Sequence, residues 1–423
     1  MIDMSVFNRL EKKLRSGALL TVLYGLCSLP AGAAVLNINA SFAPDSAAPH
    51  RNEFKNQTPS QGFCTQVPQA CEPEGLFSLI APIAFTANAP IRANHADPRQ
   101  GGMAKVPSEW RDVQVTHSSG ETHIVKIRIA GIGHESAIPV PISELTGQDG
   151  LRGWDSLWQG GGWIYAPSPC QGVGWATAGT RGYNSFWKVP RGAGVCAKQA
   201  LLEIPLSFRY LYFVFGYQLI TPNPLSMQSG QYTGSITFSV GPGQDFDTGD
   251  VMQPDDSTLT LNFNLDVQHT LKVDIPPGGN KVELVPEGGW QNWLQNGRKP
   301  VRLFRDQTFN ISASSRFKME LSCFITGTNN CMIVDLVSGR TAEVQISISL
   351  PNGLTDLVGE PVKRRRFYSG SHRAQQFQPA FYVDRAPGVL HFEIDSFYVN
   401  SMLQSGRAAT YSGTVTVIWD SEV

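Results

Sequence analysis

The stretch LTLNFNLDVQHTLKVDI, residues 259–275, alternates apolar and polar residues with a period of two, and only His269 interrupts the apolar parity. This period is typical of a β-strand with one buried side and one solvent-facing side. At about 3.4 Å per residue the stretch is too long for one ordinary strand. We therefore expect it to bend or to change sheets near His269-Thr270, as strands do at the corners of sandwiches.

The same alternation recurs elsewhere, at residues 125–129 and again at residues 344–350. The 41 glycines and 28 prolines suit a chain of many strands and turns. No segment after the N-terminal region has the pattern of a convincing amphipathic helix. The sequence therefore predicts an all-β protein.

A short pattern occurs twice, once in the middle of the chain and once near its end. Gln228-Ser229-Gly230 precedes the first copy, YTGSITF at 232–238, and Gln404-Ser405-Gly406 precedes the second, YSGTVTV at 411–417. Each copy ends a long β-rich stretch, which predicts two sandwich domains of similar ancestry that close with the same strand. Chance convergence of two edge strands is the alternative.

The region after the first copy predicts the domain boundary. Gly241-Pro242-Gly243 and Gln253-Pro254-Asp255-Asp256 are rich in turn residues, and the next alternating stretch begins at Leu259. We place the linker at 253–257, the first domain at 34–252 and the second domain at 257–423.

The first 33 residues have the features of a signal peptide. Four basic residues precede an apolar stretch at 18–29, which is shorter than the roughly 20 residues of a membrane span. Ala31-Gly32-Ala33 forms a small-x-small cleavage site. We expect residues 1–33 to be removed and the mature, exported chain to begin at or near Ala34.

The cysteines agree with export. Six follow the signal peptide, an even count that is typical of disulfides in an oxidising compartment, although six cysteines allow 15 pairings. The simplest prediction pairs neighbours in the sequence: Cys64 with Cys71, Cys170 with Cys196, and Cys323 with Cys331. A zinc site is the alternative, but the sequence lacks the CxxC pairs and nearby histidines that zinc sites use.

Three segments resemble the tip-subunit family of CFA/I-type (class 5) and cable pili, the pilus biogenesis initiators. They are YTGS at 232–235 leading to GPGQDFD at 241–247, the stretch 259–269 followed by LKV at 271–273 and PPGG at 276–279, and YSGTVTVIWD at 411–420. With GGW at 288–290 and LPNG at 350–353, the resemblance covers the second domain almost throughout. The first domain matches mainly at its C-terminal end.

The resemblance implies two immunoglobulin-like β-sandwich domains: an N-terminal receptor-binding domain and a C-terminal pilin domain that lacks its last strand. In the family, a periplasmic chaperone lends that strand first, and the next subunit, the major pilin, replaces it at the outer-membrane usher. This is strand addition to a sheet edge. A host glycan or glycoprotein is the expected receptor, and the fimbrial tip at the cell surface is the expected location.

The chain ends four residues after Trp419, so we expect no strand of its own to complete the second sandwich. An incomplete sandwich leaves an unpaired edge and an open apolar groove. The residues predicted to line this donor-strand groove are Leu259, Leu261, Phe263, Tyr411, Val415, Val417 and Trp419.

Candidate recognition residues gather between Trp154 and Cys196, where five of the nine tryptophans lie among many glycines. Aromatic faces stack on the C–H surfaces of sugars, and Arg and Asn side chains hydrogen-bond hydroxyl or carboxylate groups. The strongest candidate is Arg181-Gly182-Tyr183-Asn184, inside the predicted Cys170–Cys196 loop. The predicted receptor-binding residues are Arg181, Tyr183, Asn184, Trp175, Trp187 and Arg191. The alternative is that the tryptophans fill the sandwich core.

Composition and motifs limit the other classes of function. The net charge is −1 and only 16% of residues are charged, which disfavours general binding to nucleic acid. The sequence contains no HExxH, GxSxG or Walker motif. We therefore expect neither an enzyme nor a bound cofactor or metal ion.

Three hypotheses follow. The first is a fimbrial tip adhesin with a lectin-like first domain. The second is a structural subunit that initiates fibre assembly without binding a receptor. The third is a secreted carbohydrate-active enzyme with an appended β-module, which would need no donated strand.

Overall fold

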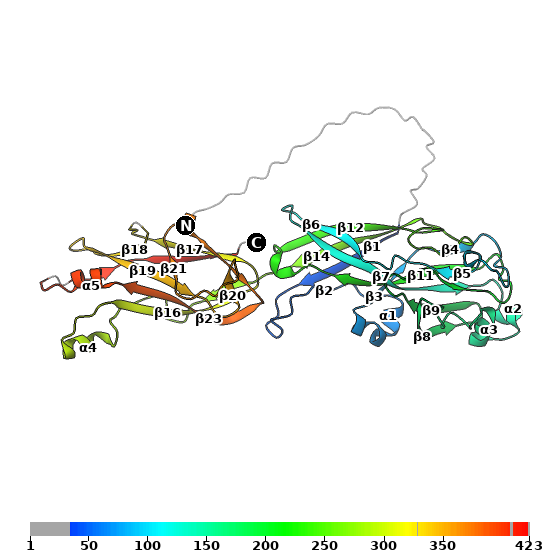
Figure 1. Cartoon of the computed structure of the whole chain (residues 1–423), viewed down its shortest axis with the longest axis horizontal. Helices are drawn as coiled ribbons and strands as arrows, with labels where there is room; N and C mark the ends of the chain where they lie inside the picture. Colours follow the sequence, from blue (N-terminus) through cyan, green and yellow to red (C-terminus); the bar gives the residue numbers. More distant parts are fainter. Residues whose placement is uncertain (1–33, 328, 407–408, 422–423) are drawn as a thin grey trace, which may run out of the picture. The chain divides into compact units, whose positions relative to one another are not determined.

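The computed structural model describes residues 34–423 apart from 328, 407–408 and 422–423. The predicted signal peptide, residues 1–33, lies outside the described residues. Strands dominate the described part (Figure 1), as the alternating patterns predict. Five short α-helices were not predicted: α1 (Phe63–Gln66), α2 (Ile142–Thr146), α3 (Gly150–Leu157), α4 (Gly289–Asn296) and α5 (Ser396–Met402).

The first β region is one continuous hydrogen-bonded sheet. Its main path runs through β13 (Met252–Pro254), β4 (Phe85–Ala87), β11 (Arg209–Ile220), β7 (Thr122–Ala137), β6 (Arg111–His117), β12 (Gly230–Ser239), β14 (Thr258–Val267), β1 (Ala34–Phe42) and β2 (Lys55–Asn56). The strands off this path are β3 (Phe77–Ala81), which pairs with β11, and the hairpin of β8 (Gln171–Ala178) and β9 (Gly182–Lys188), which joins the end of β7. A separate pair is formed by β5 (Gly102–Ala104) and β10 (Cys196–Lys198).

The stretch 259–275 changes sheets where the sequence predicts, but it does not open the second domain. Strand β14 pairs antiparallel with β12 and parallel with β1, so it is a central strand of the first sheet. Leu259, Leu261 and Phe263 are at most 1% exposed and belong to the first core. The predicted boundary at 253–257 is therefore wrong, since the first β region extends to Val267 and the second begins with β15 (Leu271–Asp274).

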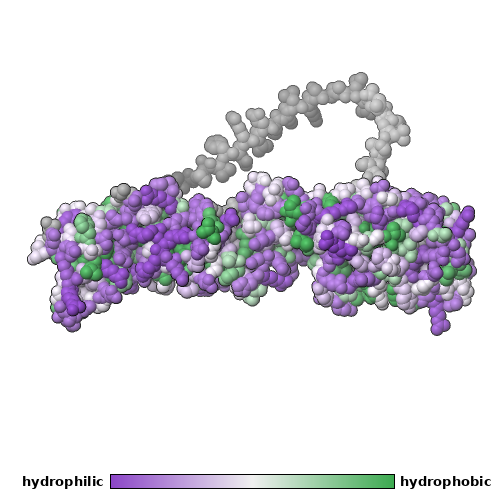
Figure 2. All heavy atoms as spheres, viewed as in Figure 1, coloured by the Kyte–Doolittle hydropathy of each residue, from purple (hydrophilic) through white to green (hydrophobic). Residues whose placement is uncertain are grey.

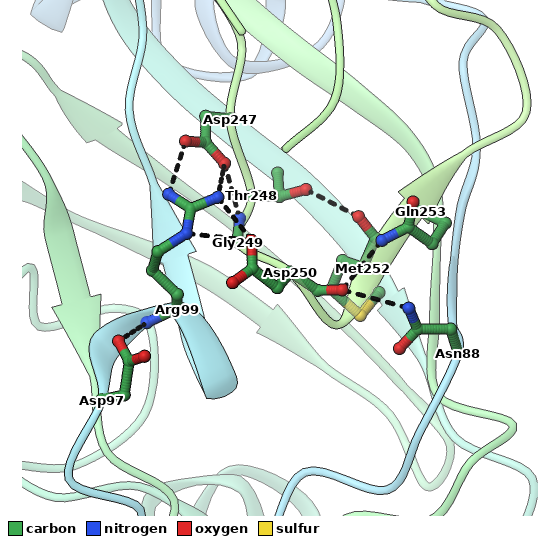
Figure 3. Close-up of polar contacts among 9 residues, drawn as sticks. All are labelled: Asn88, Asp97, Arg99, Asp247, Thr248, Gly249, Asp250, Met252 and Gln253. Atoms are coloured by element: carbon green, nitrogen blue, oxygen red, sulfur yellow. Dashed lines mark hydrogen bonds and ion pairs between the residues drawn. The ribbon is translucent and has the colours of Figure 1, made fainter. Parts of the chain in front are cut away.

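The segment predicted to be the linker, residues 253–257, is also attached to the first β region by strand pairing. Strand β13 pairs with β4, and the loop before it is held by Arg99 (Figure 3). The Arg99 guanidinium contacts Asp247 at 2.8 Å and Asp250 at 2.6 Å, and the Asp247 side chain is only 2% exposed. Turn residues in this segment therefore shape a loop within the domain, and they do not mark a flexible connection.

The second β region is built from two sheets around a shared core. The larger sheet contains β15, β16 (Leu303–Ala313), β23 (Val383–Ile394), β19 (Thr341–Ser349), β18 (Cys331–Asp335) and β24 (Tyr411–Ser412), with β21 (Arg365–Phe367) paired to β19. The smaller sheet runs in the order β20 (Leu354–Asp356), β22 (Gln375–Pro379), β17 (Phe317–Cys323) and β25 (Val415–Asp420). Residues from both sheets pack into one core, among them Ile346 of the larger and Phe377 of the smaller.

The sequence-local disulfide pairing is confirmed: Cys64–Cys71, Cys170–Cys196 and Cys323–Cys331 are bonded. On the face shown in Figure 2 hydrophilic residues predominate, and apolar residues are scattered in small groups. Within the described residues, no helix is long and apolar enough to cross a membrane.

Candidate functional site

Two of the predicted recognition residues are core residues. Tyr183 and Trp187, both on β9, are each 1% exposed. The Tyr183 hydroxyl accepts a hydrogen bond from the Ile164 amide at 2.9 Å, and the Trp187 indole donates to the Trp163 carbonyl. The prediction that these two side chains contact a receptor is wrong, because a two-residue period turns them to the inner face of the sheet.

The tryptophan-rich segment largely supplies a packed aromatic core. Trp163 stacks on Trp187 with ring centroids 4.5 Å apart, and Trp158 meets Trp163 edge-on at 5.4 Å. Trp154, Trp158 and Trp163 are each at most 3% exposed. Aromatic pairs of this kind stabilise cores beyond the area they bury, so the alternative that these tryptophans fill the core holds for most of them.

His134 of β7 is buried in the same core. Its ring lies 3.8 Å from the ring of Tyr210 and 4.6 Å from that of Trp163. Among the described residues, the His134 Nε2 atom has no hydrogen-bond partner. Complete burial lowers the pKa of His134 to about 3, because the charged imidazolium is poorly solvated there.

This burial predicts an acid-sensitive first domain. The unfolded chain binds a proton at His134 below a pH of about 6.5, whereas the folded chain does not until a pH of about 3. The free energy of unfolding should therefore fall, by up to about 1.4 kcal/mol per pH unit, as the pH drops through this window. Urea unfolding followed by tryptophan fluorescence should show a shallower pH dependence for His134→Phe, and equal slopes in the two proteins would contradict the assignment.

The remaining predicted recognition residues lie on or near the surface. Arg181 is exposed in the turn between β8 and β9, and within the described residues only its backbone carbonyl is engaged, accepting a hydrogen bond from the Ile138 amide at 2.9 Å. Arg191 is exposed and pairs with Glu109 at 2.7 Å. Arg181 directly precedes β9, and Arg191 lies in the loop that follows it. Neither arginine lines the cavity described next.

Trp175 and Asn184 line a cavity of about 410 Å³, which we call the Trp175 cavity. The structure adds lining residues that sequence reasoning missed, from α1, β3, β8, β9 and β11: Gly62, Phe63, Gln66, Ile80, Thr177, Ser185, Phe186, Tyr212 and Val214. These residues come from five separate stretches of the chain. No local pattern could have brought them together.

A second cavity, of about 450 Å³, opens in the second β region, and we call it the edge groove. Val415, Val417 and Trp419 of β25, three of the residues assigned to the donor-strand groove in the sequence analysis, line this cavity. Tyr411 pairs with Asp335 of β18 and is not among the lining residues, and Leu259, Leu261 and Phe263 are in the first core. The other lining residues are Val273, Ile275, Gly279, Asn280, Val282, Leu284, Gln307, Thr308, Phe309, Ile333, Val344, Leu390, Phe392, Gly413, Thr414 and Thr416.

Two strand edges flank the edge groove. Among the described strands, β25 is the terminal strand of the smaller sheet and pairs only with β17, while β15 is the terminal strand of the larger sheet. Val415, Val417 and Trp419 are each only half-buried, whereas Phe309 below them is 2% exposed. An apolar strand face is therefore left partly uncovered beside unpaired backbone groups.

The internal repeat shows what covers the matching strand in the first β region. Strand β12 carries the first copy of the repeat, and β14 pairs with it along its whole length, from Gly230 opposite Val267 to Ser239 opposite Thr258. The aligned Tyr232 is 0% exposed there. The second copy spans β24 and the start of β25, and β25 has no counterpart of β14 among the described residues.

The described residues form two mostly β regions, and the terminal strands β25 and β15 of the second region lie beside the edge groove. No protein-family model and no curated protein sequence matches it. A solved chaperone–tip adhesin complex, described as vital for synergistic activation of CFA/I fimbriae biogenesis, matches with 9% sequence identity and a TM-score of 0.26 over 92% of this chain and 96% of that chain. A chaperone–tip subunit pre-assembly complex of the archaic chaperone-usher Csu pili of Acinetobacter baumannii matches with 9% identity and a TM-score of 0.20 over 92% and 99%. At these TM-scores neither superposition supports a conclusion about function.

Proposed function

We propose that this chain is the tip subunit of a chaperone-usher fibre, exported through the periplasm and displayed at the cell surface. The edge groove is the observation that carries the proposal. It combines a partly uncovered apolar face on β25 with edges of β25 and β15 that pair with no further strand in the described part of the chain. A strand supplied by another protein would pair with the backbone and fill the groove with alternate side chains.

The proposed partners follow from this chemistry. A periplasmic chaperone supplies the strand first, and the N-terminal extension of the major pilin replaces it at the outer-membrane usher. The second β region is then an immunoglobulin-like pilin domain that is completed only in complex. A secreted enzyme has no need for such an edge, so the groove favours a fibre subunit over a carbohydrate-active enzyme.

A strand fused to the C-terminus is the direct test of the groove. The mature chain alone should aggregate or melt at low temperature, because its uncovered edge invites pairing with other chains. The fused chain should run as a monomer in size exclusion. A chain that is already a monomer and equally stable without the added strand would contradict the proposal.

The first β region is the proposed adhesive domain, with Arg181 at the receptor. Its guanidinium is exposed in a glycine-flanked turn, within the segment closed by the Cys170–Cys196 disulfide. Arg181→Ala should reduce adhesion to cells or immobilised glycans about tenfold or more, since charge-assisted hydrogen bonds of Arg contribute about 1.5–3 kcal/mol. Unchanged adhesion by a folded variant would remove Arg181 from the site and favour a purely structural initiator.

A further inference from the structure

The Trp175 cavity lies on a small satellite core of the first β region. Its floor is the stacked pair Phe63 and Phe186, with ring centroids 4.3 Å apart and planes 5° from parallel. Phe63 belongs to α1, which the Cys64–Cys71 disulfide ties to the following turns. Figure 1 shows α1 and the β8–β9 hairpin on the same side of the sheet. The cavity is therefore bounded by a disulfide-anchored segment on one side and a strand on the other.

A β-bulge sets the position of Trp175. The pairing register of β8 with β9 shifts between Gly172 and Ala176, and Gly174 within the shift has a φ of +68°. A residue with a side chain is strained at this φ, so glycine permits the bulge. The Trp175 ring then meets Phe63 edge-on at 5.6 Å and remains half-exposed. Bulges commonly re-aim a side chain next to binding sites.

Polar groups converge on the same cavity. Asn184 and Tyr212 both line the cavity, and burial, together with the nearby Glu135 carboxylate, raises the pKa of the Tyr212 hydroxyl to about 12. The Asn184 side chain offers an amide donor and a carbonyl acceptor, and the neutral Tyr212 hydroxyl can donate or accept a hydrogen bond. Gln66 and Thr177 also line the cavity, and their side chains make no hydrogen bond within the described part of the chain. The rim therefore offers several free hydrogen-bonding groups beside an aromatic face.

The charge of the cavity restricts its ligand. None of the described lining residues carries a charge at neutral pH, and the Glu135 carboxylate acts electrostatically on Tyr212, which lines the cavity. An anionic ligand would find no cation and would face the field of this carboxylate. The volume of about 410 Å³ lies within the range of roughly 300–1,000 Å³ that small-molecule sites occupy.

We propose that the Trp175 cavity binds a neutral hexopyranose unit of a glycan, with the sugar ring stacked on Trp175 and its hydroxyls hydrogen-bonded by Asn184, Gln66 and Thr177. Aromatic faces pack well against the C–H face of a sugar ring, and amides and hydroxyls match its alcohol groups. Sialylated and uronic acid glycans are disfavoured for lack of a cation. The inference rests on the proposed adhesive role of the first β region and assigns that role a site apart from Arg181.

The test uses the full mature chain on an array of neutral oligosaccharides and their sialylated counterparts, followed by calorimetric titration of the neutral oligosaccharide that binds best. Trp175→Ala should weaken this binding at least tenfold, and Trp110→Ala is the matched control because Trp110 is a half-exposed tryptophan of the same β region outside the cavity. Thermal melting of each variant checks its folding. A loss specific to Trp175→Ala, with neutral glycans preferred, supports the assignment.

The contrary results separate this inference from the proposed function. If Arg181→Ala abolishes glycan binding while Trp175→Ala retains it, the domain is adhesive but the Trp175 cavity is not its site. If sialylated glycans bind better than neutral ones, the charge argument fails and the inference with it. If the wild-type chain binds no glycan on the array, the inference is overturned, whereas the fused-strand experiment still decides the role in assembly.

Discussion

Fusing a copy of the chain's own strand, residues 258–267, after Val423 through a short flexible linker should raise the melting temperature of the second β region by about 10 °C or more. The internal repeat selects this strand, because β14 pairs antiparallel with the first copy of the repeat in β12. Aligning the copies places Leu261 of the fused strand opposite Val415 and Leu259 opposite Val417. Each apolar side chain that fills the groove contributes about 1.5–3 kcal/mol before the entropy of ordering the strand is subtracted.

The control is a second fusion with the same strand length and the same linker. In it, the fused residues that copy Leu261 and Phe263 are replaced by Asp, so that docking would bury two unpaired carboxylates. This control should melt like the unfused chain in differential scanning calorimetry. A stabilisation shared by both fusions would show that the added strand acts without entering the groove, and the edge groove would then lose its proposed role.

Replacing Arg99 by Met should destabilise the first β region by about 2–4 kcal/mol. The side chain of Asp247 is 2% exposed and receives the Arg99 guanidinium and the Gly249 amide. Removing one partner of such a pair leaves a buried carboxylate uncompensated, which costs about 3–5 kcal/mol when both partners are buried. Arg99 is 34% exposed, and solvent screening reduces the expected loss.

Two further variants make this prediction specific. Asp250→Asn should cost less than about 1 kcal/mol, because the Asp250 side chain is 45% exposed. Combining Arg99→Met with Asp247→Asn should recover part of the loss, since the buried charge is then gone. Urea unfolding followed by tryptophan fluorescence reports on this region, which holds six of the nine tryptophans. Equal losses in Arg99→Met and Asp250→Asn would contradict the role of Asp247.

The candidate sites were only partly accessible to sequence reasoning. Trp175 and Asn184 line a cavity, whereas Tyr183 and Trp187, predicted from the same segment, are buried. Residues on one strand alternate between faces, and the sequence does not say which face meets the core when both carry aromatic residues. No sequence pattern pointed to Gln66 or Tyr212, because they line the Trp175 cavity only when segments that are distant in the chain come together.

Local patterns were enough to predict a chain of strands and the internal repeat and to favour the three disulfides, because side-chain alternation, turn chemistry and short loops act between neighbours in the chain. Tertiary structure alone decided which sheet each strand joined. Strand β14 has the same alternation whether it opens the second domain or completes the first, and only its pairing with β12 and β1 assigns it to the first. Period-two alternation specifies a buried face but not the partner that buries it, so the alternation of β25 could not by itself show that its apolar face is only partly covered.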